Sequence, residues 1–143
     1  MGHREMPEHI DDKLIHQIEC CIRMGAEEFY FGDHGDYDAC VIRALKEMKT
    51  RYPHMNRILV IPYHPAVYRC REGIEYDEML YPFEKPIPPR YAIDRANRWM
   101  IRSCDALIAY VCKRGKAYTY LRLAEHKQKL AKMVIVNLAD GEP

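Results

Sequence analysis

The chain has 143 residues, the length of one ordinary domain with a buried core. Its 22 basic and 21 acidic residues nearly cancel, so nucleic acid is not an expected partner. No apolar run is long enough to cross a bilayer and no signal peptide opens the chain, so no membrane partner is expected. Its 6 cysteines show neither a Cys-x-x-Cys pair nor zinc spacing. We interpret them as reduced thiols, which predicts a cytoplasmic protein.

Helix-like and strand-like segments alternate along the chain. Asp11 and Asp12 can cap a first helix that stops near Gly25. Apolar and β-branched runs predict strands at 27–31, 57–62, 105–111 and 133–138. Amphipathic runs predict helices at 38–52, 91–103 and 117–131. The segment 64–90, rich in proline, tyrosine and charge, is predicted to be a long loop insertion that serves as a lid or specificity loop.

This alternation predicts the class of fold. Strands that alternate with helices form parallel βαβ units with right-handed crossovers, and the helices then cover both faces of one sheet. We therefore expect residues 1–143 to form a single α/β domain, a three-layer sandwich with a mostly parallel sheet.

The stretch from Gly32 to Asp38, Gly-Asp-His-Gly-Asp-Tyr-Asp, follows a predicted strand and leads into a predicted helix. In open α/β sheets ligands bind at this edge, and helix N-termini attract anions. Gly32 and Gly35 allow a tight turn and a close approach to a ligand. We favour an anion-binding turn, but a plain connection with Asp36 or Asp38 as the helix cap stays open. A metal site is the rival interpretation, and its ligands would be Asp33, His34, Asp36 and Asp38. No metal site is predicted, because the spacing of these residues matches no EF-hand.

Three other segments carry related chemistry. Gly-His-Arg at 2–4 precedes the first helix, a cluster of Arg and Asn lies at 90–98, and Cys-Lys-Arg-Gly-Lys-Ala occupies 112–117. Arginine forks suit phosphate and carboxylate groups. Carboxyl ends of parallel strands share one edge, so we predict convergence on one pocket there. The converging residues are Gly32, Gly35, Arg90, Arg95 and Gly115. A solvated helix face for Arg95 and Arg98 is the simpler alternative.

Together, these motifs resemble the SLOG superfamily, and within it small bacterial YpsA-like proteins. The resemblance covers nearly the whole chain, through GHRE, FYFGDHGDYD, ILVIPYHP, RYAIDRANRWMI, CDALIAYV and VIVNLA. It implies a Rossmann-like sheet that holds a nucleotide or nucleotide-derived ligand. Rossmann-like modules of this size often associate through a helix face, so we also expect a homodimer. The ligand-binding residues that the resemblance implies are Gly2, His3, Arg4, Gly32, Gly35, Tyr37, Asp38, Arg90, Arg95, Asn97, Arg98, Gly115 and Ala117.

Two departures from the family pattern shape the expectation. The family usually has a full strand before Gly-His-Arg, whereas here Met1 alone precedes it, so we expect a truncated first strand. The Pro-Gly-Gly-x-Gly-Thr-x-x-Glu motif of the phosphoribohydrolase relatives is absent, so their activity is not carried over.

Two main function classes stay open. Binding or sensing of a nucleotide-like ligand is favoured, without any certain cofactor. The alternative is a hydrolase that acts on an N-glycosidic or phosphate bond of a nucleotide. Such an enzyme needs a positioned acid or base, but no arrangement in the sequence forces a catalytic role on the candidates Asp33, His34, Asp36, Asp38 and His64. A purely structural oligomerising protein is a weaker third interpretation.

Overall fold

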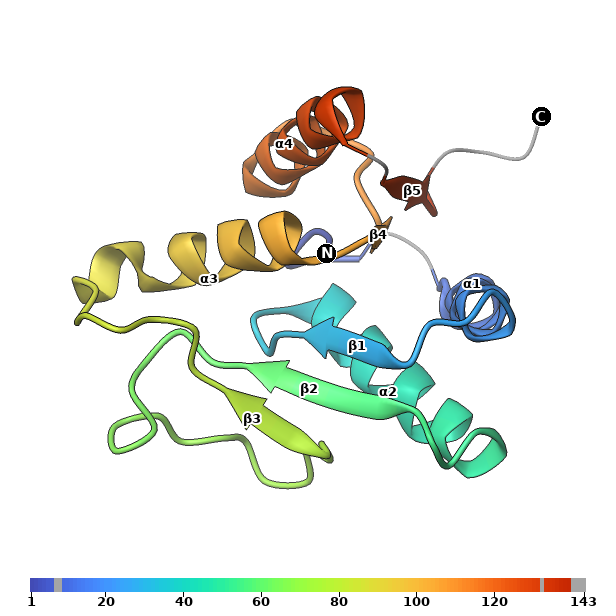
Figure 1. Cartoon of the computed structure of the whole chain (residues 1–143), viewed down its shortest axis with the longest axis horizontal. Helices are drawn as coiled ribbons and strands as arrows, with labels where there is room; N and C mark the ends of the chain where they lie inside the picture. The colour runs from blue at the N-terminus through green and yellow to red at the C-terminus, as the bar shows by residue number, and fades with distance from the viewer. Residues whose placement is uncertain (7–8, 132, 140–143) are drawn as a thin grey trace.

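The computed structural model describes residues 1–6, 9–131 and 133–139, in which helices and strands alternate (Figure 1). The helices are α1 (Asp11–Arg23), α2 (Asp36–Arg51), α3 (Pro89–Ser103) and α4 (Lys116–Leu130). The strands are β1 (Glu28–Phe31), β2 (Asn56–Val60), β3 (Glu78–Leu80), β4 (Ala106–Ala109) and β5 (Val134–Asn137). All pairings between these strands are parallel. The prediction of an α/β fold of the Rossmann-like kind is thus confirmed.

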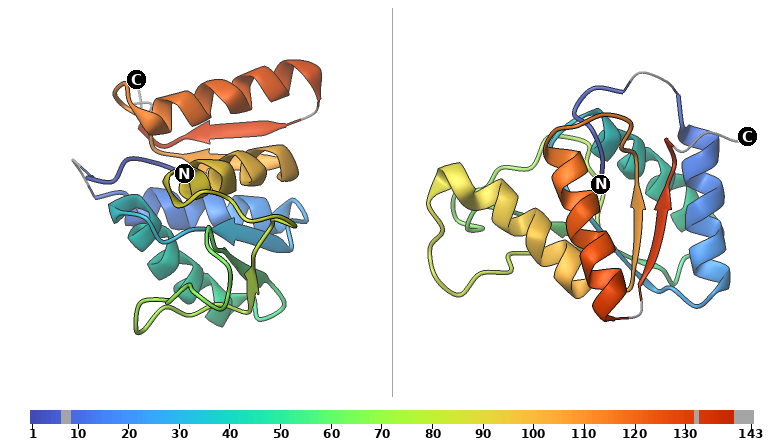
Figure 2. Two further views of the ribbon diagram at one scale, coloured as in Figure 1. Left: turned by 90° about the vertical axis from the view of Figure 1, so that its left-hand side faces the viewer. Right: turned by 90° about the horizontal axis from the view of Figure 1, so that it is seen from above.

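Helices cover both faces of the strands. The side chains of β2 show this division, because successive strand residues point to opposite faces. Leu59 packs into the core formed with α1 and α2, whereas Ile58 and Val60 pack against Ala96 and Trp99 of α3. Viewed from above, α3 and α4 lie on one side of β4 and β5, and α1 lies on the other (Figure 2). The three layers expected from the sequence are therefore present.

The strands form two sheets, not the single sheet predicted. β1, β2 and β3 make one sheet in that order, and β4 and β5 make the other. The position between β1 and β4 holds no described strand. Gly2 forms a parallel bridge with Tyr110, just beyond β4, so the amino-terminal segment reaches only the end of this position. The side chain of Tyr37 in α2 reaches β4, where its hydroxyl donates a hydrogen bond to the carbonyl oxygen of Ile108 at 2.7 Å.

The predicted long loop at 64–90 contains regular structure. β3 lies within it and pairs in parallel with β2, and α3 begins at Pro89. An ion pair between the buried Arg57 and the more exposed Asp77 holds the segment before β3 in place. Arg57, whose residue is 8% exposed, donates from Nε to the Oδ2 atom of Asp77 at 3.1 Å. The hydrogen bonds from Arg57 keep the pKa of Asp77 well below its usual range, in spite of partial burial.

The helix starts differ from the predicted caps. The N-cap of α1 is Ile10 and that of α2 is Gly35, and neither helix has a side-chain cap. The aspartates expected as caps lie in the first turns, where their charge favours the helix dipole. These are Asp11, Asp12, Asp36 and Asp38. Gly25 lies just beyond α1 with φ +104°, which agrees with the predicted stop.

Candidate functional site

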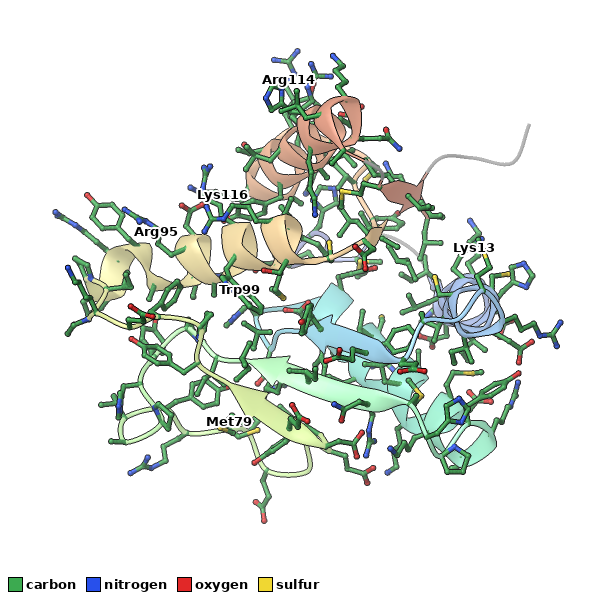
Figure 3. All side chains as sticks on the ribbon, in the orientation of Figure 1. Lys13, Met79, Arg95, Trp99, Arg114 and Lys116 are labelled. Atoms are coloured by element: carbon green, nitrogen blue, oxygen red, sulfur yellow. The ribbon has the colours of Figure 1, made fainter. Side chains whose placement is uncertain are left out.

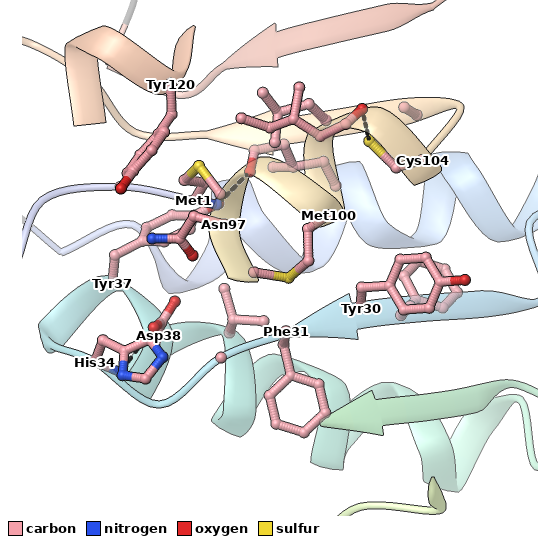
Figure 4. Close-up of a pocket in the computed structure, with 18 of the residues that line it drawn as sticks. Met1, Tyr30, Phe31, His34, Tyr37, Asp38, Asn97, Met100, Cys104 and Tyr120 are labelled. Carbon is pink, nitrogen blue, oxygen red and sulfur yellow. Dashed lines mark hydrogen bonds between the residues drawn. The ribbon is translucent and has the colours of Figure 1, made fainter. Parts of the chain in front are cut away.

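A cavity of about 680 Å³ lies between β1 and β4 and extends to the carboxyl ends of these strands (Figure 4). This volume is typical of small-molecule sites, which span roughly 300–1,000 Å³. Its interior is lined by apolar residues such as Phe31, Met100 and Leu107. Its carboxyl end, here called the mouth, is lined by polar segments from the amino terminus, the turn before α2, and the starts of α3 and α4.

Most residues predicted to bind a ligand line this cavity. They are Gly2, His3, Arg4, Gly32, Gly35, Tyr37, Asp38, Arg90, Asn97 and Ala117. The structure places Arg95, Arg98 and Gly115 outside the lining. Arg95 is exposed on α3, whereas Trp99 of the same helix packs against Tyr30 of β1 (Figure 3). The structure therefore brings together Gly32, Gly35 and Arg90 but not Arg95 or Gly115.

The two glycines of the turn before α2 allow close contacts within the chain. A Cβ atom on Gly35 would lie 2.7 Å from the Cα atom of Arg4. A Cβ atom on Gly32 would lie 3.1 Å from Cδ2 of His34 and 3.3 Å from Oδ2 of Asp38. Position 35 thus needs glycine for packing in the absence of any ligand, whereas a side chain at position 32 would require His34 and Asp38 to shift by a few tenths of an ångström. A Gly35→Val substitution would disturb the amino-terminal segment as well as the turn.

Two backbone donors at the same turn already have partners. The N–H of Asp36 donates to the carbonyl oxygen of Arg4 at 2.8 Å. The N–H of His34 donates to Oδ2 of Asp38, also at 2.8 Å. An anion at this turn would have to displace these acceptors. The start of α2 is therefore less open to phosphate than its glycines suggested.

His3 is held as a neutral acceptor at the mouth. Its Nε2 atom accepts a hydrogen bond from the N–H of Cys112 at 3.0 Å, so the neutral ring carries its proton on Nδ1. Burial, together with the nearby charge of Lys113, lowers the pKa of His3. The ring also contacts Tyr110 edge-on, with centroids 6.0 Å apart. His3 is thus an ordered part of the site and not a mobile terminal residue.

His34 is the polar side chain that lacks a partner. Of the buried side-chain nitrogen and oxygen atoms in the described residues, Nε2 of His34 is the one that forms no hydrogen bond. Burial lowers its pKa, although the charges of Asp38 and Asp33 act in the opposite direction. A buried polar atom without a partner is costly, by about 1–3 kcal/mol, so the free ring nitrogen is available to a ligand or water.

A polar cluster joins α3 to α4 at the mouth. Asp94 accepts a hydrogen bond from the hydroxyl of Tyr120 at 2.8 Å and another from Nε of Arg98 at 2.9 Å. Burial acts to raise the pKa of Asp94, but these hydrogen bonds outweigh it and leave the pKa lowered. Burial also raises the pKa of Tyr120 to about 12. Sequence reasoning missed Asp94 and Tyr120, although the Asp94–Arg98 spacing of four is a recognisable helix pair.

The cations of the cavity lining gather at its mouth. Arg4, Arg90 and Lys116 are exposed there. The first turn of α4 contains no acidic residue, and its N-cap Gly115 makes no side-chain cap. The start of α4 is therefore the helix N-terminus at the mouth that best suits an anion. The opposite end of the cavity is acidic, with Glu28 and Asp105 in its lining among others.

Asp33 is engaged elsewhere. Its side chain is 5% exposed and forms a two-pronged ion pair with Arg71, in which Nε lies 2.9 Å from Oδ2. This pair ties the loop before β3 to the turn before α2. Among the described residues, no group of three His, Cys, Asp or Glu side chains is placed to hold a metal ion.

No family model matches the chain, and no curated protein sequence matches it at a significant level. Within the described residues, no helix combines the length and apolar character needed to cross a membrane. The fold and the site define a parallel α/β protein with a cavity at the carboxyl edge of its strands.

Proposed function

We propose that the protein binds or senses a nucleotide or nucleotide-derived ligand at the mouth of the cavity, as a SLOG-type, YpsA-like module would. The observation that carries this proposal is the convergence of four segments at the carboxyl edge of parallel strands, where α/β proteins hold such ligands. The motifs that resemble the family supply most of the lining at that edge.

Charge sets the orientation of the ligand. The start of α4, with Lys116, and the exposed Arg90 favour phosphate on that side of the mouth. Asp38 lies across the mouth in the first turn of α2, where a carboxylate suits a ribose hydroxyl. This arrangement differs from the sequence hypothesis, which assigned the phosphate to the turn at Gly32 and Gly35.

Calorimetry with a panel of nucleosides, nucleotides and dinucleotides tests the proposal. Phosphorylated compounds should bind and the matching nucleosides should bind more weakly. Lys116→Gln should weaken binding by roughly tenfold to a hundredfold, because a charge-assisted hydrogen bond is worth about 1.5–3 kcal/mol. Lys129→Gln, at the exposed far end of α4, is the matched control. Equal affinity of both variants would remove the phosphate assignment, and binding that disappears with EDTA would favour a metal site at the turn.

The hydrolase alternative rests on His34. A neutral imidazole with a free, buried Nε2 beside Asp38 has the makings of a general base. Incubation of the purified protein with nucleotides, followed by chromatography, would reveal released base or phosphate. Release that is lost in His34→Asn but kept in His126→Asn, an exposed control on α4, would favour the enzyme. Unchanged nucleotide after long incubation would leave binding as the function.

Assembly and location follow as secondary proposals. The homodimer expected for a Rossmann-like module of this size would give a sedimentation mass of two chains at micromolar concentration. All 6 cysteines are free thiols, which favours a reducing compartment such as the cytoplasm.

A further inference from the structure

The ring of His34 carries a buried nitrogen that the described part of the chain leaves without a partner. The ring lies beside Gly32, just beyond the end of β1, and lines the cavity (Figure 4). A Cβ atom on Gly32 would lie 3.1 Å from Cδ2 and 3.4 Å from Nε2 of this ring, so the glycine gives the imidazole its place. An unpaired buried nitrogen is costly, and it therefore indicates a position where a ligand completes the site.

Asp38 flanks the same small space. Its Oδ2 atom lies 3.3 Å from the place of a Cβ atom on Gly32, and it accepts the backbone N–H of His34 at 2.8 Å. This hydrogen bond holds the carboxylate beside the ring. The other oxygen, Oδ1, forms no hydrogen bond within the described part of the chain, and Asp38 also lines the cavity. The turn thus presents a carboxylate acceptor next to the free ring nitrogen.

These two groups suit hydroxyls better than phosphate. A carboxylate accepts hydrogen bonds and repels an anion, whereas a hydroxyl donates to it. A neutral imidazole nitrogen accepts in one tautomer and donates in the other, and a hydroxyl can pair with it in both cases. Burial lowers the pKa of His34 and so favours this neutral form. Two neighbouring hydroxyls of a sugar therefore match the pair.

The position of the pair fits the sugar of a nucleotide. The phosphate is placed across the mouth, beside Arg90 and the start of α4 with Lys116. The ribose of a nucleotide is joined directly to its phosphate, and in dinucleotide sites of α/β proteins an acidic side chain accepts a ribose hydroxyl. A nucleotide with its phosphate at α4 would bring its sugar toward His34 and Asp38.

We propose that His34 and Asp38 hold the 2′- and 3′-hydroxyls of a ribose, one on each side chain, so that the site selects ribonucleotides over 2′-deoxyribonucleotides. This inference rests on the proposed nucleotide function and adds the class of sugar to it. Both hydroxyls of a ribose project from the same face of the sugar ring, which matches two groups that flank one small space. A deoxyribose would leave one group of the pair without its partner, and a site built to bind a hydroxyl rejects such an analogue.

Calorimetry with matched pairs of nucleotides tests the sugar directly. The probes are AMP, GMP, CMP and UMP, each with its 2′-deoxy form. For every base that binds, the ribose form should bind more tightly by roughly tenfold to a hundredfold, because the deoxy form loses one hydrogen bond to a buried or charged group. The arabinose form of AMP, whose 2′-hydroxyl lies on the opposite face of the sugar, should bind as weakly as the deoxy form. Discrimination that follows the base and not the sugar would overturn the inference.

Substitutions of His34 assign the selectivity to its ring. His34→Asn loses the position of Nε2, so most of the preference for ribose should disappear. His34→Gln places an amide near that position and should restore much of it. His126→Asn, at an exposed position of α4, is the matched control and should keep the full preference. A variant that merely loosens the turn would weaken both sugars alike, so an unchanged ratio of the two affinities in His34→Asn would overturn the role of the ring.

Nitrogen NMR gives a measurement that needs no variant. In a chain with labelled histidines, the Nε2 signal of His34 should shift on addition of AMP and stay in place on addition of 2′-deoxy-AMP at equal occupancy. Equal shifts would overturn the assignment even if His34→Asn fails to fold.

The outcomes separate this inference from the proposal on which it rests. If neither series of nucleotides binds, the nucleotide function fails and the sugar selectivity fails with it. If ribose and deoxyribose forms bind equally well, the selectivity alone fails. Lys116→Gln should weaken both forms by the same factor, because it acts on the phosphate. A preference for ribose that vanishes in Lys116→Gln would count against its assignment to His34 and Asp38.

Discussion

The buried amino group of Met1 should make stability depend on pH. Burial lowers its pKa from 8.0 to about 5, against the opposing charges of Asp38 and Cys104. Between these two values the unfolded chain binds a proton that the folded chain does not. Stability should therefore fall as the pH is lowered from 8 to 5 and change no further through this group below 5. A difference of about 3 between the two pKa values corresponds to about 4 kcal/mol, an upper limit for this single group.

Acetylation of the amino terminus isolates the effect. The acetylated nitrogen keeps one N–H for the carbonyl oxygen of Ile108 but cannot be charged, and the adjoining cavity has room for the acetyl group. Urea unfolding of both forms at several pH values between 5 and 8 gives the comparison. His3 and His34 also have lowered pKa values, but they act equally in both forms. The stability gap should widen by up to about 4 kcal/mol as the pH falls. Parallel curves would refute the reasoning.

Two substitutions test what holds the fold around the site. Asp77→Asn should destabilise the chain by about 1.5–3 kcal/mol, because it weakens the charge-assisted hydrogen bonds of the buried Arg57. Glu47→Gln removes an exposed i,i+4 pair and should cost under about 1 kcal/mol in the same denaturant titration, so equal losses would contradict the assignment. Gly2→Ala would put its Cβ 2.6 Å from Cγ of Tyr37, and scanning calorimetry should show a loss of about 1–3 kcal/mol. An unchanged Tm would mean that the ring moves aside freely.

The sequence predicted most of the fold because most strands carry their signal locally. β2 contains the apolar run Ile58, Leu59 and Val60, which is buried on both faces, and its pattern reflects that burial directly. β3 escaped prediction because its three residues, Glu78–Leu80, lie among charges and prolines and form a strand only by pairing with β2. The break between the two sheets depends on which strands meet in space, and local patterns do not encode that.

The site was predictable in position but not in detail. Glycine turns and basic residues at strand-to-helix connections indicated the carboxyl edge, and Gly35 and Arg90 do line the cavity there. The contacts of these residues depend on partners far along the chain. Gly35 packs on Arg4, and Tyr37 bonds to Ile108, 71 residues away. No periodicity or spacing reveals such pairs, so their structural roles emerged only from the fold.

The two parts of the cavity meet at the amino-terminal segment, and this predicts coupling between them. Met1 begins the pairing with β4, while His3 and Arg4 belong to the mouth, where the Arg4 carbonyl oxygen accepts from the start of α2. A substitution that loosens this segment would add an ordering cost to ligand binding at the mouth. Ordering one residue costs about 1–2 kcal/mol, so Gly2→Ala, whose Cβ would collide with Tyr37, should weaken nucleotide binding roughly tenfold. Calorimetry on Gly2→Ala and on the unaltered chain should show this loss, with the exposed Glu47→Gln as control. Equal affinities would mean that the order of the mouth does not depend on the amino-terminal segment.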